Sequence, residues 1–255
     1  VHQYRGHMLN MCGDPNGGAE ALGEALRVHG DALENMDYLT GVADLAGIHL
    51  LRGRAREGLE WTTRGLERTA IDRGARRLTE GHTYRCYAAT LLALLGRADE
   101  GRQHLEEFAR SIRVEDRWRR TQWLAHRALF LAEIGAEPEE LEAVLRDFAS
   151  LKLSVRRLPI QIRHVFLAQA MIRLAQVDGS PASILRWKKA RATLAAGATH
   201  PTLRAHLAVL DAAWHAYRGN GEASARALDE AERLAEATGN ELVRWDVARQ
   251  RALVA

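Results

Sequence analysis

Cysteines and long apolar runs are both scarce in this sequence. It has two cysteines in 255 residues, Cys12 and Cys86, which stand far apart and outside any C-x-x-C motif. This argues against a disulfide scaffold and against a cysteine-based zinc site, and two free thiols are typical of a protein in the reducing cytoplasm. No apolar run approaches the roughly 20 residues of a membrane-spanning helix, so we expect no membrane partner.

Residues that break helices or favour strands are also few. The chain has five prolines, its aromatic content is 6%, and alanine, leucine and arginine dominate. These residues favour helix nearly throughout. With 47% apolar and 27% charged residues, the composition is that of an ordinary globular protein with ample material for a core.

Motifs of catalysis and ligand binding are missing as well. The sequence has eleven histidines, but none occurs in H-x-x-x-H or H-E-x-x-H spacing or beside a cysteine, as metal sites require. The glycine-rich stretches GDPNGG and GNGE lack the Lys-Ser/Thr ending of a phosphate-binding loop, and no nucleophile-elbow or kinase motif occurs. We therefore expect a protein without enzymatic activity, metal or cofactor.

What the sequence does contain is a recurring unit, clearest from His82 to Ala109. An apolar run, Leu91 to Leu95, stops at Gly96, and a second amphipathic run follows. A glycine that takes positive φ ends a helix and allows a second helix to fold back on it. Equivalent turn glycines recur at intervals of roughly 40 residues, at Gly13, Gly53, Gly96, Gly135, Gly179 and Gly219.

Small residues stand at fixed distances from these turn glycines. Five residues after the turn, the first three units have Gly18, Gly58 and Gly101. Seven residues before it, the first four units have Gly6, Ala46, Ala89 and Ala128. Neither helix of a pair can bury its apolar stripe alone, so the units must stack, and we expect the small residues where the two helices approach most closely.

This spacing resembles the tetratricopeptide repeat, although the period is longer than the usual ~34 residues. It is also similar to the long-period arrays of STAND-type ATPase regulators and of bacterial kinase and ATPase fusions, most clearly in residues 225–255. The resemblance implies an all-α, right-handed superhelix, or α-solenoid, of about six antiparallel helix pairs plus a terminal helix. We expect residues 1–255 to form one such domain, a piece of a larger multidomain protein.

Local signals predict where several helices start. Asn35 or Asp37 is expected to cap the helix that runs through Leu51. Ser180, followed by Pro181, is expected to cap the helix that runs through Leu194, because proline is favoured in the first turn.

The resemblance also indicates which side chains would face a partner, since the first helix of each pair lines the concave groove in tetratricopeptide arrays. It selects ten partner-binding candidates: Asp44, Thr83, Tyr87, Arg119, Gln122, His126, Gln169, Arg173, His206 and Tyr217. Thr40, Thr90, Glu133 and Gln176 belong to the same polar stripe. Such a row of hydrogen-bonding groups suits an extended peptide or a partner helix. The alternative is a polar lining that contacts only water.

We therefore expect a non-enzymatic scaffold or sensor module of a bacterial signalling or transcription-regulatory protein. Its groove would bind a protein or peptide, which includes other domains of the full-length chain. A second hypothesis is nucleic-acid binding by the basic stretch from Arg110 to Arg163, with Trp118 and Trp123 for stacking. Against it, 36 basic and 33 acidic residues nearly balance, and the tryptophans could be core while the arginines pair with nearby acids such as Glu106, Glu107, Glu115 and Asp116.

Overall fold

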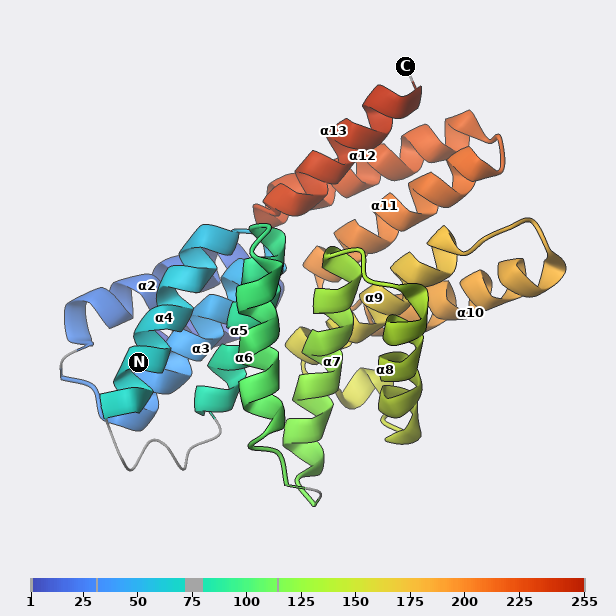
Figure 1. The fold of residues 1–255 in the computed structure, drawn as a ribbon. Coiled ribbons are helices and arrows are strands. Elements are labelled where there is room, and N and C mark those ends of the chain that lie inside the picture. Colours follow the sequence, from blue (N-terminus) through green and yellow to red (C-terminus); the bar gives the residue numbers. More distant parts are fainter. Residues whose placement is uncertain (1, 31, 72–79, 114, 255) are drawn as a thin grey trace.

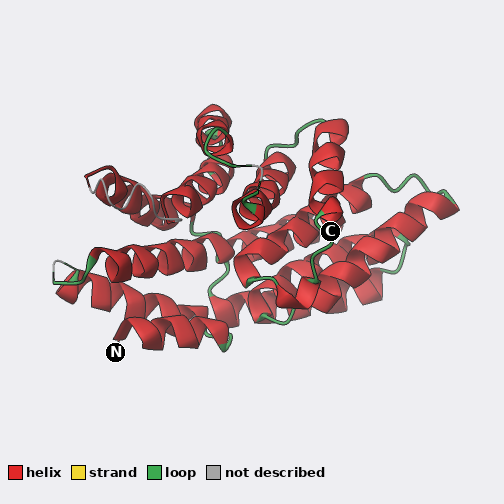
Figure 2. Ribbon diagram, turned by 90° about the horizontal axis from the view of Figure 1, so that it is seen from below, coloured by secondary structure: helices red, strands yellow, loops and turns green. Residues whose placement is uncertain are grey.

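The computed structural model describes residues 2–30, 32–71, 80–113 and 115–254 (Figures 1 and 2). Over these residues the predicted all-helical fold is confirmed. The helices are α1 (His2–Met11), α2 (Pro15–His29), α3 (Asn35–Leu51), α4 (Ala55–Ile71), α5 (Glu80–Leu94), α6 (Ala98–Ala109), α7 (Arg117–Glu133), α8 (Pro138–Ser150), the 3₁₀ turn η2 (Val155–Arg157), α9 (Ile160–Ala175), α10 (Pro181–Gly197), α11 (Pro201–Tyr217), α12 (Gly221–Thr238) and α13 (Glu241–Val254).

Five of the six predicted turn glycines lie two residues beyond the end of a helix, whereas Gly179 lies four residues beyond the end of α9, in the link that leads into α10. Gly13, Gly53, Gly96, Gly135, Gly179 and Gly219 all have positive φ, as does Gly239, which ends α12. At Gly96 the amide of Arg97 donates a 2.8 Å hydrogen bond back to the carbonyl of Leu92. This satisfies a carbonyl that the end of the helix would otherwise leave without a donor.

The small residues lie where paired helices touch. A Cβ added to Gly101 on α6 would lie 2.8 Å from the carbonyl oxygen of Ala89 on α5 and 2.7 Å from the ring of Phe130 on α7. A Cβ added to Gly18 on α2 would lie 2.9 Å from the carbonyl oxygen of Gly6 on α1. These separations leave no room for a side chain, so the predicted helix contacts are confirmed.

One of the two predicted helix caps is present. Ser180 accepts a hydrogen bond from the amide of Ser183 at the start of α10. The prediction for α3 was wrong, because Glu34 occupies the capping position and its side chain makes no capping bond. The helix starts at Asn35, so Asp37 lies within the first turn, where its negative charge still suits the helix dipole.

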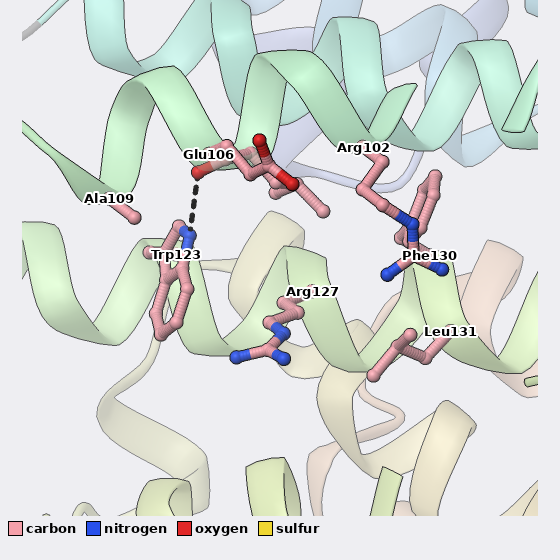
Figure 3. A pocket seen from close by; sticks show the side chains of 8 residues that line it. Arg102, Glu106, Ala109, Trp123, Arg127, Phe130 and Leu131 are labelled. Atoms are coloured by element: carbon pink, nitrogen blue, oxygen red, sulfur yellow. Dashed lines mark hydrogen bonds between the residues drawn. The ribbon is translucent and has the colours of Figure 1, made fainter. Parts of the chain in front are cut away.

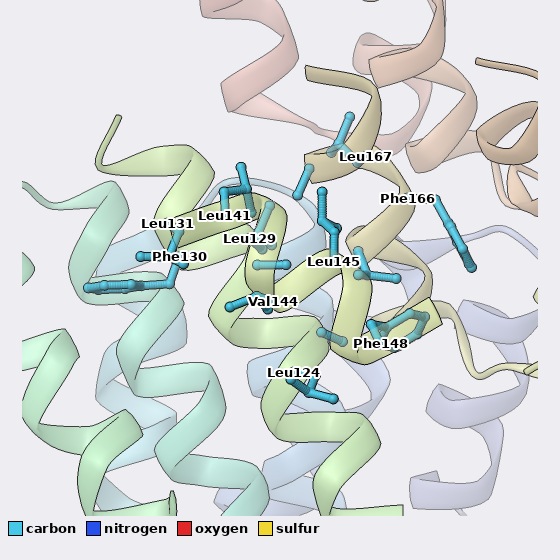
Figure 4. Packing of buried hydrophobic residues seen from close by; sticks show 14 of the residues in the cluster. Leu124, Leu129, Phe130, Leu131, Leu141, Val144, Leu145, Phe148, Phe166 and Leu167 are labelled. Carbon is cyan, nitrogen blue, oxygen red and sulfur yellow. The ribbon is translucent and has the colours of Figure 1, made fainter. Parts of the chain in front are cut away.

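The first helices of the pairs form one continuous layer. Each odd-numbered helix from α1 to α13 packs against the next odd-numbered helix, and each even-numbered helix packs on its own pair. The buried side chains between α7, α8 and α9 form the largest stretch of this core, including Leu124, Phe130, Leu145 and Phe166 (Figure 4).

The layer also curves back on itself. Nε2 of His200, just before α11, donates a 2.9 Å hydrogen bond to the carbonyl of Asn10 in α1. Glu241, at the start of α13, donates its amide to the carbonyl of Arg52 at 2.8 Å. A buried cluster of Leu51, Ile160, Ala198 and Leu203 packs the end of α3 against the start of α9 and the start of α11. In a purely linear stack each repeat touches only its neighbours. These contacts instead bring α11 and α13, near the end of the layer, against α1 and α3, near its start.

Candidate functional site

Four of the ten partner-binding candidates are buried, namely Tyr87, Gln122, His126 and His206. Gln122 donates a 3.0 Å hydrogen bond to the hydroxyl of Thr83, and the ring of His126 lies edge-on to that of Tyr87 at 5.3 Å. These side chains link neighbouring helices of the first layer. Tyr87, Gln122 and His126 therefore project between helices, and the chain itself covers them in this structure.

Curvature of the layer explains part of this burial. A Cβ added to Gly47 on α3 would lie 3.1 Å from the hydroxyl of Tyr87 on α5 and 3.4 Å from the side chain of Gln161 on α9. Three helices of the layer therefore meet over the hydroxyl end of Tyr87. Sequence periodicity assigns Tyr87 to the inner side of α5, but it does not report that α9 covers that side.

Most of the other candidates have partners within the chain. Asp44 lies 2.9 Å from His7, Arg119 lies 3.1 Å from Asp116, and Arg173 forms an ion pair with Glu142 on α8. Gln169 is half-buried and Tyr217 is half-exposed, its ring stacked on Trp214. The ten residues are therefore spread over the layer and do not converge on one site.

Among the described residues, the first-helix layer has an open groove of about 430 Å³ between α7, α9, α11 and α13, which we call the inner groove. Of the polar residues selected from the sequence, it holds His206 and Glu133. Its full lining is Ala132, Glu133, Leu167, Met171, Leu174, Ala175, His206, Val209, Leu210, Ala213, Leu242, Trp245, Asp246, Arg249 and Gln250.

The walls of the inner groove are mainly apolar. Met171 and Leu174 come from α9, and Leu210 comes from α11. Trp245 on α13 is 60% exposed, and the guanidinium of Arg249 lies 5.1 Å from the centre of its ring. An exposed tryptophan on an apolar groove offers a large contact area to a ligand.

Two carboxylates give the groove its polarity. Burial raises the pKa of Asp246, although Arg249 lies 3.2 Å away and opposes this shift. Burial, and then the charge of Asp246, raises the pKa of Glu133 from 4.5 to about 7. Glu133 is the last residue of α7, where the carbonyl end of the helix is itself negative.

Glu133 has no counter-ion within the described part of the chain, where no side chain pairs with it. His206, across the groove, accepts a 3.3 Å hydrogen bond from the amide of Asn240. Burial, and then the nearby His164, lowers the pKa of His206 to about 3, so this imidazole stays neutral. At a pH above about 7, where Glu133 is deprotonated, the groove therefore has one carboxylate that no charge among the described residues compensates.

The basic stretch from Arg110 to Arg163 borders a smaller crevice of about 160 Å³ between α6 and α7 (Figure 3). Nε1 of Trp123 donates a 3.0 Å hydrogen bond to the carbonyl of Leu105. Arg127 lies 5.0 Å above the ring of Trp123 and 3.1 Å from Glu140. Trp123 thus has one ring face covered, which leaves it poorly placed for base stacking.

Other arginines of this stretch also bind acceptors within the chain. Arg163 donates to the carbonyls of Leu158 and Gly197, and Arg117 donates to the carbonyl of Leu151. Trp118, in contrast, is 44% exposed. The surface therefore has fewer uncommitted cations than the sequence suggests.

Sequence reasoning missed Trp245, Asp246 and Arg249, which line the inner groove from α13. The available signal was a tryptophan, Trp245, followed one turn later by Arg249 in the terminal helix. Because the sequence prediction treated this segment only as a terminal helix after the last complete pair, none of its residues was given a binding role.

Within the described ranges, no three histidine, cysteine or acidic side chains come together as a metal site would require. None of the helices seen there is both long and apolar enough to cross a membrane. Comparison of the chain with protein-family models, curated proteins and solved structures finds no match.

Proposed function

We propose that this chain is a non-enzymatic binding module that takes a segment of a partner protein or peptide into the inner groove. The observation that carries the proposal is an open, mainly apolar groove on the first-helix layer, with the exposed Trp245 on its wall. Concave apolar sites with a few polar groups are the usual form of a binding site in proteins. Grooves between helices commonly take an amphipathic helix or an extended chain.

The proposal includes the finer description of the fold. The chain is a tetratricopeptide-like, right-handed α-solenoid of the long-period, STAND-associated type, and it serves a bacterial signalling or transcription regulator in the cytoplasm. Regular turn glycines, close approaches at small residues and the continuous first-helix layer support this description.

Nucleic-acid binding has weaker support. Phosphate-tracking surfaces need exposed, uncommitted cations and accessible aromatic rings. Here Arg117, Arg127 and Arg163 donate to acceptors within the chain, and Trp123 is hydrogen-bonded to the backbone.

Selection from a displayed library of random twelve-residue peptides tests the proposal. Ala213 lines the groove and is half-buried, so Ala213→Trp fills the groove without disturbing the core. Ala216 is exposed on the same helix outside the lining, so Ala216→Trp is the matched control. We expect enriched peptides to bind the wild type and Ala216→Trp but not Ala213→Trp. Failure to enrich any peptide, or equal binding to both variants, would refute the groove as a peptide site.

A further inference from the structure

The charge of the inner groove suggests the chemistry of its occupant. We infer that the bound segment carries one lysine or arginine flanked by large apolar residues, and that its cation pairs with Glu133. This inference rests on the proposed function and adds the partner's chemistry to it.

The charged and titratable groups that face Glu133 come from two other helices. α13 contributes Asp246 and Arg249, which form an ion pair at 3.2 Å, and α11 contributes the neutral His206. From α9 the lining is apolar, with Leu167, Met171, Leu174 and Ala175. The pair on α13 neutralises itself, so one carboxylate is left and one cation completes the site.

An apolar segment laid in the groove would cover Glu133 further. A carboxylate removed from water without a partner is strongly unfavourable, so it either takes up a proton or requires a cation. A segment without a basic side chain would incur this penalty on docking. A lysine or arginine avoids it, and its methylene stem packs on the apolar walls while its head reaches the carboxylate.

Trp245 is a less suitable partner for that cation. The guanidinium of Arg249 already lies over its ring at 5.1 Å, and a second cation on the same ring would meet a like charge. Glu133, at the negative end of α7 and without an ion pair among the described residues, is the open position.

Pairing with a cation also links binding to pH. Burial and Asp246 hold the pKa of free Glu133 at about 7, and a bound cation lowers it, so the complex favours the deprotonated carboxylate. Below pH 7, Glu133 must therefore lose a proton when the segment binds. Affinity should rise roughly tenfold between pH 6 and pH 8 and level off above that range.

The test uses a peptide enriched by the library selection and a synthetic copy in which its basic residue is norleucine, which has a similar stem and no charge. Both are titrated against wild type, Glu133→Gln and, as a control, Glu139→Gln at an exposed position on α8. We expect norleucine to weaken binding to wild type and Glu139→Gln by about 30-fold or more. Against Glu133→Gln the two peptides should differ by less than about threefold, because the charge partner is gone.

The outcomes separate this inference from the proposed function. Enriched peptides that are blocked by Ala213→Trp but share no basic position would overturn the inference and leave groove binding intact. So would equal affinities of the two peptides for wild type. Peptides insensitive to Ala213→Trp would instead remove the proposed function itself.

Discussion

The side-chain amide of Asn240 donates a 3.1 Å hydrogen bond to the carbonyl of Leu51, which lies 189 residues earlier in the chain, and both residues are buried. The same amide reaches Nε2 of His206, while Oδ1 of Asn240 accepts from the amide of Val243 and caps α13. One side chain thus holds the start of α13 against the end of α3. It also fixes the helix that carries Trp245 into the inner groove.

Replacing Asn240 by Asp should destabilise the protein by about 2–4 kcal/mol. Aspartate retains the capping oxygen but presents a buried, charged oxygen to the carbonyl of Leu51 in place of an N–H donor. Asn220 is the matched control, since it caps α12 through a 3.0 Å bond to Ala223 and is exposed. Asn220→Asp should change the free energy of unfolding by less than about 0.5 kcal/mol, because both residues cap helices well. Urea denaturation measures both, and equal effects would mean that the contact between α3 and α13 does not matter for stability.

Gly101→Leu should destabilise the protein by a few kcal/mol, in the range of overpacked cores. The side chain would have to displace the backbone of Ala89 or the ring of Phe130. At Gly221, in the first turn of α12, a Cβ meets no atom within 4 Å, so Gly221→Leu should be nearly neutral. Glu139→Ala, at an exposed position on α8, should also do little. Thermal unfolding compares the three variants, and a Gly101→Leu midpoint close to that of Gly221→Leu would contradict the α5–α6 contact.

His126 should make the protein sensitive to acid. Burial, and then the nearby His164, lowers the pKa of His126 from 6.5 to about 3. Between these values the unfolded chain binds a proton that the folded chain does not, so stability is lost as the pH falls below 6.5. The loss for this one residue is about 2 kcal/mol between pH 7 and pH 5.

Replacing His126 by Phe should reduce the pH dependence of stability by about that amount. The ring contact with Tyr87 can remain, and the substitution removes a buried nitrogen, Nε2, that has no hydrogen-bond partner among the described residues. Urea unfolding at pH 5 and pH 7 measures the effect, with His29→Phe at an exposed position as the control. An unchanged pH dependence in His126→Phe would show that His126 is not held neutral by burial.

Glu133 should have the opposite effect to His126, because it should make the protein less stable as the pH rises. Its folded-state pKa is raised from 4.5 to about 7, so the folded chain binds more protons than the unfolded chain between those values. Its contribution to stability is full below pH 4.5 and is lost as the pH rises through 7. Glu133→Gln should therefore gain about 2 kcal/mol over wild type between pH 5 and pH 8. A constant difference between the two proteins over this range, measured by urea unfolding, would contradict the raised pKa.

Local features of the fold could be predicted from the sequence. The positive φ at Gly96 favours glycine at that position. The close approach of α5 to Gly101 leaves no room for a side chain there. Both constraints act over a few residues or between adjacent helices. The spacing of such residues therefore predicts helix pairs and their order.

The path of the whole layer could not be predicted in this way. The contacts of His200 with Asn10 and of Asn240 with Leu51 join segments about 190 residues apart, and no periodicity encodes how far successive pairs rotate. That rotation decides which inner-face side chains are covered. It buries Tyr87 under α9 and leaves Glu133 open to the inner groove, although both residues stand on first helices.

Hydrogen exchange, measured with and without a peptide enriched by the library selection, tests the central claim most directly. If the peptide binds in the inner groove, exchange should slow in residues 206–213 of α11 and 242–250 of α13. It should remain unchanged in α8 and α10, the second helices of their pairs. Slower exchange confined to α6, α8 or α10, or none in α11 and α13, would contradict the assignment of the groove as the binding site.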